Sequence, residues 1–334
     1  MKSKVLKQIF KICVAGVTSL AILCVFCLFY YNLSVHYTSE SGSTDYKWAT
    51  DRFYAKATEG FAWGRTDKNG FNNSYKEDFE KIDVLFMGSS HLEAFNGQQK
   101  YNTVYQYNTF YERDGKDKFA YNIGVSGHSL LICLDNLEDA IKEFKPTETI
   151  VIETPTIHMR ESSLELLVND KMYDLESEDN KFAVALANVP YLRLMYNQLV
   201  FLRQADAPVQ PEEFGDVNKY TQNLNFVLKR ASQLAKKHGI KLMVVYNSPM
   251  EIDSKGNLLP QTYEEYVDIM DAACKNADIT FVNMYQPYAD YYKETYRLPH
   301  GFSNTRVGTG HINRYGHQVI AETVYDILEN GEGR

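Results

Sequence analysis

A serine at the end of a short apolar run is the first residue that could do chemistry. The run IDVLFM, residues 82–87, stops at Gly88-Ser89-Ser90-His91. A serine at a tight strand-to-helix turn presents its hydroxyl at the carboxyl edge of a sheet, where backbone N–H groups can bind an oxyanion. Gly88 permits such a close turn. Ser90 is therefore a candidate nucleophile, although a helix N-cap or an anion-binding turn has the same pattern.

Two further segments contain residue types that could serve such a serine. The turn NIGVSG, residues 122–127, could donate a backbone N–H to a developing negative charge. Near the C-terminus, GHINRYGH (310–317) places His311 in a glycine-containing loop before a helical pattern, where it could act as general base. Asn313 is expected to help start that helix, and His317, inside it, is expected to pack or cap.

Predicted strands and helices alternate around these segments. Short, mostly apolar runs predict strands at 82–87, 119–124, 149–153, 241–246 and 279–284. Amphipathic patterns predict helices at 130–144, 218–239, 262–277 and 316–330. This alternation indicates a three-layer α/β/α fold with a central parallel sheet of about five strands. In such sheets ligands bind at the carboxyl ends of the strands, which is where the candidate residues fall.

The N-terminal segment predicts a membrane anchor. Residues 12–31 are uncharged and mostly apolar, and a helix of about 20 residues rises ~30 Å, the thickness of a bilayer core. Lys2, Lys4, Lys7 and Lys11 precede it, so the N-terminus is expected in the cytoplasm and the rest outside the cell. A cleaved signal peptide is the alternative, but this run is longer and ends in bulky residues rather than small ones.

Four parts follow from these patterns. We expect a basic tail at 1–11, a transmembrane signal-anchor at 12–31, a polar stalk at 32–75 and one large domain at 76–334. Residues 158–215 fit the alternation poorly and are interpreted as an insertion, partly helical around 189–202, that shapes the cleft or meets a partner.

Composition excludes several classes of protein. The net charge is -8, and the only basic run lies in the first dozen residues, so a nucleic-acid partner is not expected. Beyond the anchor only Cys133 and Cys274 remain, which argues against a disulfide framework. Beyond the anchor there is no CxxC and no Cys/His spacing typical of zinc, so neither a metal nor another cofactor is expected.

Together the three segments resemble the SGNH (GDSL-like) hydrolase superfamily, over about 80–330. FMGSS matches its first block with Ser90 as nucleophile, NIGVSG matches its second with Gly127 as the oxyanion glycine, and HINRYGH matches its last with His311 as catalytic histidine. The resemblance implies the SGNH, flavodoxin-like form of the fold and an acyl-enzyme mechanism. The oxyanion would be held by the N–H groups of Ser90 and Gly127.

Two departures from the family pattern concern the histidine and the oxyanion hole. The family often has Asp three residues before the histidine, and here that position is Gly308. A Ser-His dyad, or an acid such as Glu93 or Glu153 approaching in space, is expected to replace it. The family's Asn after the third strand is also missing.

The segment that follows the third strand is ETPTIH, residues 153–158, so His158 or Thr156 is a candidate donor in place of the Asn. His91 and His128 adjoin proposed site residues and are further accessory candidates.

The sequence is similar to single-pass bacterial SGNH proteins that work with membrane-bound O-acyltransferases. This resemblance implies an extracellular esterase or O-acyltransferase acting on acyl, foremost acetyl, esters of an envelope polysaccharide or teichoic-acid-like polymer. The competing hypothesis is a degenerate SGNH domain that binds glycan or scaffolds an acyltransferase complex. The distance from the Ser90 hydroxyl to His311 separates the two hypotheses. A lipase or thioesterase would instead require a long apolar groove.

Overall fold

The computed structural model describes residues 2–32, 35–37, 46–48, 50–73, 81–169, 191–192, 194–195, 216–305 and 308–331. Its centre is a five-stranded sheet in the order β10-β9-β8-β6-β7. Every pair of neighbours in it is parallel. The strands are β6 (Val84–Met87), β7 (Ala120–Asn122), β8 (Thr149–Thr154), β9 (Lys241–Tyr246) and β10 (Thr280–Asn283).

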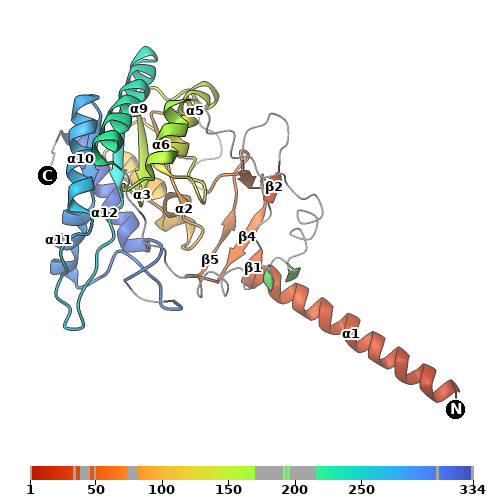
Figure 1. The fold of residues 1–334 in the computed structure, drawn as a ribbon. Helices are drawn as coiled ribbons and strands as arrows, with labels where there is room; N and C mark the ends of the chain where they lie inside the picture. Colours follow the sequence, from red (N-terminus) through yellow and green to blue (C-terminus); the bar gives the residue numbers. More distant parts are fainter. Residues whose placement is uncertain are drawn as a thin grey trace.

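Helices cover both faces of this sheet, so the three-layer α/β/α prediction is confirmed (Figure 1). Alternate strand residues face opposite layers: Ile150 and Ile152 of β8 join one core cluster, and Val151 joins the other. The first layer contains α4 (Leu130–Asp135), α5 (Leu137–Phe144), α6 (Glu161–Val168), α9 (Val217–Lys237) and α10 (Glu264–Asn276). The second contains α2 (Ser90–Glu93), α3 (Thr103–Arg113), α11 (Tyr285–Thr295) and α12 (Arg314–Tyr325).

The order of the strands determines where a ligand can bind. β6 comes first along the chain but lies between β7 and β8. The chain therefore continues from β6 to β7 toward one edge of the sheet, and from β8 to β9 toward the other edge. A crevice forms at the carboxyl ends of the strands at such a switch point. Ser90 follows β6 and Glu153 lies near the end of β8, so both lie at this edge of the sheet.

The five predicted strands are confirmed, with small shifts of their ends. The helix expected at 130–144 is two helices, α4 and α5, separated at Asn136. The helix expected at 316–330 is α12 followed by one π-helical stretch, η3 (Asp326–Asn330). Most of the expected insertion at 158–215, including most of the helix expected around 189–202, lies outside the described residues.

A second, small sheet precedes the main one. Here β1 (Tyr31–Asn32) pairs antiparallel with β4 (Phe53–Lys56), which pairs with β5 (Ala62–Arg65). A separate pair consists of β2 (Val35–Tyr37) and β3 (Tyr46–Trp48). The described part of the segment expected to be a stalk is therefore largely folded. Strands this short lack the apolar run by which the other strands are recognised.

The N-terminal helix α1 (Lys2–Tyr30) projects away from the domain (Figure 1). Within Lys4–Tyr30, the most apolar window of 18 residues has a mean hydropathy of 2.7, and only 6% of that window is buried. By length and composition α1 can cross a membrane.

Candidate active site

Ser90 lies at the expected strand-to-helix turn. It is the first residue of α2, and Ser89 caps that helix by accepting a hydrogen bond from the His91 N–H at 3.1 Å. A Cβ on Gly88 would lie 2.8–2.9 Å from atoms of Glu153, so only glycine allows β6 and β8 to approach this closely. The turn thus presents the partly exposed Ser90 hydroxyl at the carboxyl edge of the sheet.

The structure joins Ser90, His311 and a third residue, Glu59, in one chain of hydrogen bonds. The Ser90 Oγ lies 2.8 Å from His311 Nε2, and His311 Nδ1 lies 2.5 Å from Glu59 Oε2. An ionised carboxylate can only accept, so Nδ1 carries the imidazole proton and Nε2 accepts from the serine hydroxyl. The backbone N–H of His311 also donates to Glu59 Oε1 at 3.0 Å. This is the arrangement of a nucleophile, a general base and an orienting acid.

Glu59 is the site residue that sequence reasoning missed. It lies in the turn between β4 and β5, within the segment expected to be a stalk, and it makes the contact with His311 that was expected of an acid at position 308. Gly310, at φ +86°, makes room for it, because a Cβ there would lie 2.5 Å from Glu59 Oε1. Burial alone would raise the pKa of Glu59, but the hydrogen bonds and charge of His311, with the charge of Lys56, lower it below its usual value. Glu59 is therefore held as a carboxylate.

Asn304 connects the Glu59 turn to the loop that contains His311 through three hydrogen bonds. Asn304 Oδ1 accepts from the Gly60 N–H at 2.8 Å, and its Nδ2 donates to the carbonyls of Ala57 and Gly60 at 3.0 and 2.9 Å. Asn96 Nδ2 donates to Glu59 Oε2 at 3.2 Å. Gly60 has φ +69°, and a Cβ on it would lie 2.1 Å from the Asn96 carbonyl oxygen. The geometry of the acid thus depends on these contacts.

Glu93 and Glu153, the acids expected to orient the histidine, have other partners. Glu93 accepts from Trp48 Nε1 and Ser126 Oγ. Glu153 accepts from the N–H and hydroxyl of Ser89 at 3.0 and 2.9 Å. Burial raises the pKa of both carboxyls, and the hydrogen bonds oppose that shift. His311 Nδ1 pairs with Glu59 instead, so the expectation that Glu93 or Glu153 replaces the missing Asp is wrong. Glu153 holds Ser89 in the turn before α2, and Glu93 joins α2 to Trp48 and Ser126.

His91 is locked in one neutral form beside the catalytic pair. The Ile312 backbone N–H, which can only donate, lies 3.3 Å from His91 Nδ1, and Asn247 Nδ2 lies 2.9 Å from the same atom. Nδ1 is therefore an acceptor, and the proton is on Nε2. Burial, and next the charge of His311, lower the pKa of His91 well below its usual value. Its ring centroid lies 4.8 Å from that of His311, so a neutral ring packs against the general base.

Gly127 occupies the turn after β7. It is exposed, with φ +87°, and it follows Ser126, whose hydroxyl donates to Glu93 of α2. Asn122 Nδ2 donates to the Leu92 carbonyl at 3.0 Å, which also ties this turn to α2. The second motif is therefore fixed beside the helix that begins at Ser90.

The remaining candidates have other surroundings. His158 stacks on Tyr263 with 4.1 Å between ring centroids. His128 lies partly exposed after Gly127, and its backbone N–H donates to the Val125 carbonyl at 3.1 Å.

The two motif residues that were expected to have structural roles do have them. Asn313 caps α12 by accepting from the N–H groups of Tyr315 and Gly316 at 2.9 and 3.4 Å. His317 is buried, and its Nδ1 lies 2.9 Å from Thr103 Oγ1.

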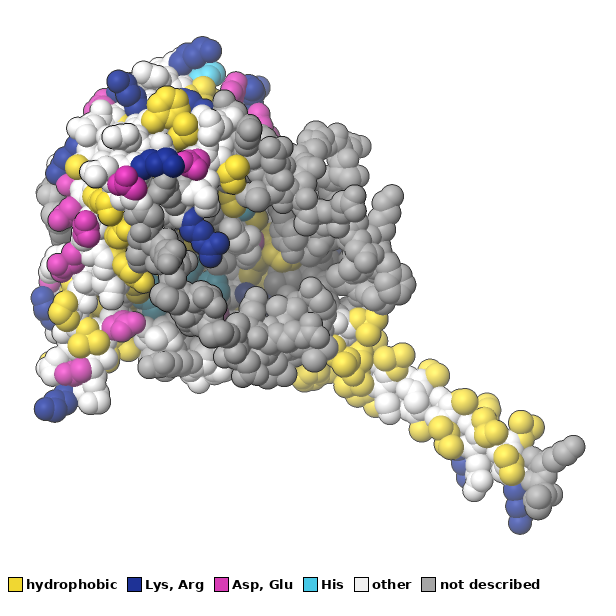
Figure 2. Space-filling model, in the orientation of Figure 1, with side chains coloured by type: hydrophobic (Ala, Val, Ile, Leu, Met, Phe, Trp, Pro, Cys, Tyr) yellow, Lys and Arg dark blue, Asp and Glu magenta, His cyan; other side chains and the backbone are white. Residues whose placement is uncertain are grey.

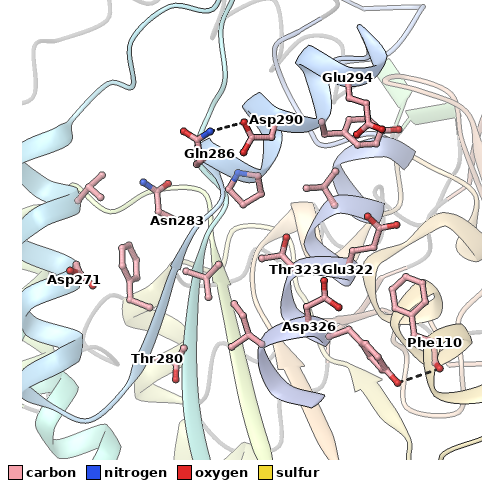
Figure 3. A pocket seen from close by; sticks show the side chains of 18 of the residues that line it. Phe110, Asp271, Thr280, Asn283, Gln286, Asp290, Glu294, Glu322, Thr323 and Asp326 are labelled. Atoms are coloured by element: carbon pink, nitrogen blue, oxygen red, sulfur yellow. Dashed lines mark hydrogen bonds between the residues drawn. The ribbon is translucent and has the colours of Figure 1, made fainter. Parts of the chain in front are cut away.

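A groove of about 730 Å³ lies away from this site, between β10 and the helices α10, α11 and α12 (Figure 3). Acidic side chains line much of it, among them Asp271, Asp290, Glu294, Glu322 and Asp326, and none of Ser90, His311 and Glu59 is part of it. Within the described ranges no group of three or more His, Cys, Asp or Glu residues could hold a metal ion.

Comparisons with known proteins find similarity in three dimensions only. No family model and no curated protein matches the chain. Among solved structures, the acetyl xylan esterase AlAXEase is 14% identical over 74% of this chain and 100% of its own, with a TM-score of 0.45. A lipolytic protein of the G-D-S-L family from Veillonella parvula is 14% identical over 74% of this chain and 98% of its own, with a TM-score of 0.41. Esterase EstA from Pseudoalteromonas sp. is 14% identical over 74% of this chain and 97% of its own, with a TM-score of 0.40.

Proposed function

We propose that this protein is a membrane-anchored serine esterase or O-acyltransferase that acts outside the cell on acyl esters of envelope glycans, acetyl esters foremost. The observation that carries the proposal is the hydrogen-bonded chain from Ser90 through His311 to Glu59, with contacts of 2.8 and 2.5 Å. A serine with such partners is an activated nucleophile.

The chemistry proceeds in two halves. Ser90 Oγ attacks the ester carbonyl carbon while its proton passes to His311 Nε2, and the tetrahedral oxyanion then expels the alcohol, which takes that proton. The acyl group is now an ester of Ser90. Water or a sugar hydroxyl attacks the acyl carbon next and gives its proton to His311 Nε2. The bond from the acyl carbon to Ser90 Oγ then breaks, Oγ takes that proton back from His311, and either the free acid or a new glycan ester is released. Glu59 stabilises the imidazolium in both halves.

Backbone donors are available for the oxyanion. Ser90 is the first residue of α2, where a helix leaves N–H groups without partners inside the helix. Gly127, in its left-handed turn beside α2, is the second donor we propose. Removing one oxyanion donor from a hydrolase of this mechanism costs roughly 10²–10³ in kcat.

The setting of the site supports a substrate at the cell envelope. The helix α1 can cross a membrane, and the lysines before it favour a cytoplasmic N-terminus and an external domain. An envelope polysaccharide or teichoic-acid-like polymer would then lie within reach. A transferase also needs an acyl donor on the outer side, and a membrane-bound O-acyltransferase is the partner we propose for supplying it.

The alternative is a degenerate domain that binds glycan or scaffolds a membrane complex. Such a domain would have no need to hold a serine against a histidine and a carboxylate. The 2.8 Å contact between Ser90 and His311, and the carboxylate that fixes the tautomer of the histidine, favour the enzyme.

The test uses the full chain in detergent with acetylated envelope polysaccharide and a small acetyl ester as substrates. We expect wild-type turnover that is lost in Ser90→Ala and retained in Ser162→Ala, an exposed serine of α6. Release of free acetate indicates hydrolysis, and acetate moved to an added acceptor glycan indicates transfer. Equal turnover by wild type and Ser90→Ala would contradict the proposal.

A further inference from the structure

We propose that the outer face of the small β1-β4-β5 sheet lies in the headgroup region of the bilayer that α1 enters, so that the turn carrying Glu59 is held at the membrane surface. This inference rests on the membrane anchoring argued above. The surface concerned does not include the reacting groups of Ser90 and His311. Its position would place the substrate close to the outer leaflet of the bilayer.

The two faces of the β4–β5 hairpin differ in an unusual way. Tyr54 and Ala62 point to one face, are almost completely buried, and pack with Trp48 and Phe95. A sheet with one buried face normally has polar side chains on the other.

Here the other face exposes aromatic side chains. Trp63 is paired with Ala55, Phe53 is paired with Arg65, and paired residues point to the same face. Phe61 directly precedes β5 and is also exposed. The exposed fractions of Phe53, Phe61 and Trp63 are 44%, 56% and 56%. Three exposed aromatic side chains on this face and at its edge indicate a surface that meets something apolar.

The position of α1 identifies the bilayer as that partner. The helix runs into β1 without a linker, and the Ala57 N–H donates to the Tyr30 carbonyl at 2.8 Å. The turn end of the hairpin, residues 57–61, therefore adjoins the last residue of the apolar helix. Figure 2 shows hydrophobic side chains along α1 up to the place where the helix meets the domain. Trp and aromatic residues favour the interface between lipid and water, which is where the end of a spanning helix lies.

The consequence concerns the catalytic acid. Glu59 is in the same short turn as Phe61, so the element that meets the membrane also completes the site. Asn304 binds that turn to the loop of His311, which leaves little freedom for the domain to swing away from the bilayer. The ester substrate is therefore presented within reach of the outer leaflet, as a lipid-linked glycan or a polymer close to the membrane.

The tryptophan content gives a direct test. The chain has two tryptophans, Trp48 and Trp63. Trp48 is 7% exposed and donates to Glu93, whereas Trp63 is 56% exposed on the proposed surface. The full chain is placed in lipid nanodiscs at one chain per disc, and its fluorescence is quenched by phospholipids brominated at shallow or deep acyl positions. A single chain per disc prevents contact with a second copy.

We expect shallow bromines to quench the wild type more than deep ones, and Trp63→Phe to lose most of the quenchable signal while Trp48→Phe retains it. A second variant, Phe61→Ser, should reduce the quenching of Trp63. A wild type that lipid bromines leave unquenched, or quenching that persists in Trp63→Phe, would overturn the inference.

Labelling of Ser90 by a fluorophosphonate is measured on the same discs. If Ser90 is labelled but Trp63 is not quenched, only the proposed contact of the small sheet with the bilayer is refuted. If Trp63 is quenched but Ser90 is not labelled, only the proposed enzyme activity is refuted.

Discussion

The hydrogen bond between His311 and Glu59 decides which imidazole nitrogen carries the proton. With a carboxylate at Nδ1, the free lone pair of Nε2 faces the Ser90 hydroxyl, as a general base requires. The residue that sets this tautomer, Glu59, comes from the N-terminal segment of the chain.

The substitution Glu59→Gln tests that dependence. An amide can present its NH₂ group to Nδ1, which would then accept, so the Nε2 proton would face the serine and block proton transfer. We expect kcat to fall about 10³- to 10⁴-fold with KM little changed, as in other triads with a neutralised acid. Glu264→Gln, an exposed glutamate of α10, is the control. Wild-type kcat in Glu59→Gln would show that the site works as a dyad.

Glu59 also predicts a dependence of stability on pH. Its pKa in the folded protein is lowered from the usual 4.5, so its contribution to the free energy of unfolding is present above that value and is lost as the pH falls through the folded pKa. The buried Glu93 and Glu153 have raised pKa values and oppose this trend. We therefore compare Glu59→Gln with the wild type: the loss of thermal stability between pH 7 and pH 3 should be smaller in the variant. An equal loss in both proteins would contradict the prediction.

Candidate roles for Ser90, Gly127 and His311 could be predicted from the sequence, because each residue lies in a local motif with glycine and a neighbouring strand or helix. Glu59 could not be found in this way, because it lies 31 positions before Ser90 in a short turn with no apolar pattern around it. The sequence indicates only that the expected acid is missing, because position 308 is a glycine. The acid had to come from elsewhere, and only the folded chain reveals from where.

At the scale of elements, two loops that are distant in sequence act as one unit. The β4–β5 turn holds the acid, the loop before α12 holds the base, and Asn304 joins them with three hydrogen bonds of 2.8–3.0 Å. The acid is thus positioned by the second loop as well as by its own hairpin.

The variant Asn304→Ala should loosen this unit without touching the reacting atoms. We expect kcat to fall about 10- to 100-fold, because a shift of about 1 Å in a positioning group has an effect of this size. KM should stay near the wild-type value, and the free energy of unfolding should fall by about 1–2 kcal/mol. Asn218→Ala, an exposed asparagine of α9, should leave kcat unchanged. A loss of stability in Asn304→Ala without a fall in kcat would assign Asn304 a structural role only.

Sequence patterns identified the elements of the main sheet well and the small ones poorly. The strands β6 to β10 are apolar because both faces of the sheet are covered, so they are visible as continuous runs. The helices α3 and α11 were not predicted; their buried faces are built largely from tyrosines, such as Tyr107 and Tyr288, and give a weak apolar pattern. The hairpin of β4 and β5 is four residues per strand and covers a small core of its own.

In the whole molecule, an apolar helix, a small sheet with exposed aromatic residues and an α/β domain follow one another along the chain. The helix α1 ends where the small sheet begins, and the small sheet contributes the acid to the site of the large domain. The apolar helix and the cluster of Ser90, His311 and Glu59 are therefore joined over a few residues of the small sheet.

The direction in which α1 crosses the membrane can be tested on whole cells. We expect a protease added to intact cells to degrade the domain and to leave a tag placed before Lys2 protected, because the lysines of the first turns favour the cytoplasm. The matched control replaces Lys4, Lys7 and Lys11 with glutamine, which should reduce the fraction of correctly oriented protein. A domain that is protected in intact cells and degraded only after lysis would contradict an external site.

The most direct test of the central claim is to map the residue that becomes covalently modified. The full chain is treated with a fluorophosphonate probe, digested and analysed by peptide mass spectrometry, beside Ser90→Ala and Ser162→Ala. The account predicts an adduct on Ser90 in the wild type and in Ser162→Ala, no adduct in Ser90→Ala, and slow formation in Glu59→Gln. An adduct on another serine, or a folded wild type that stays unmodified, would contradict the claim that Ser90, His311 and Glu59 form a working nucleophile.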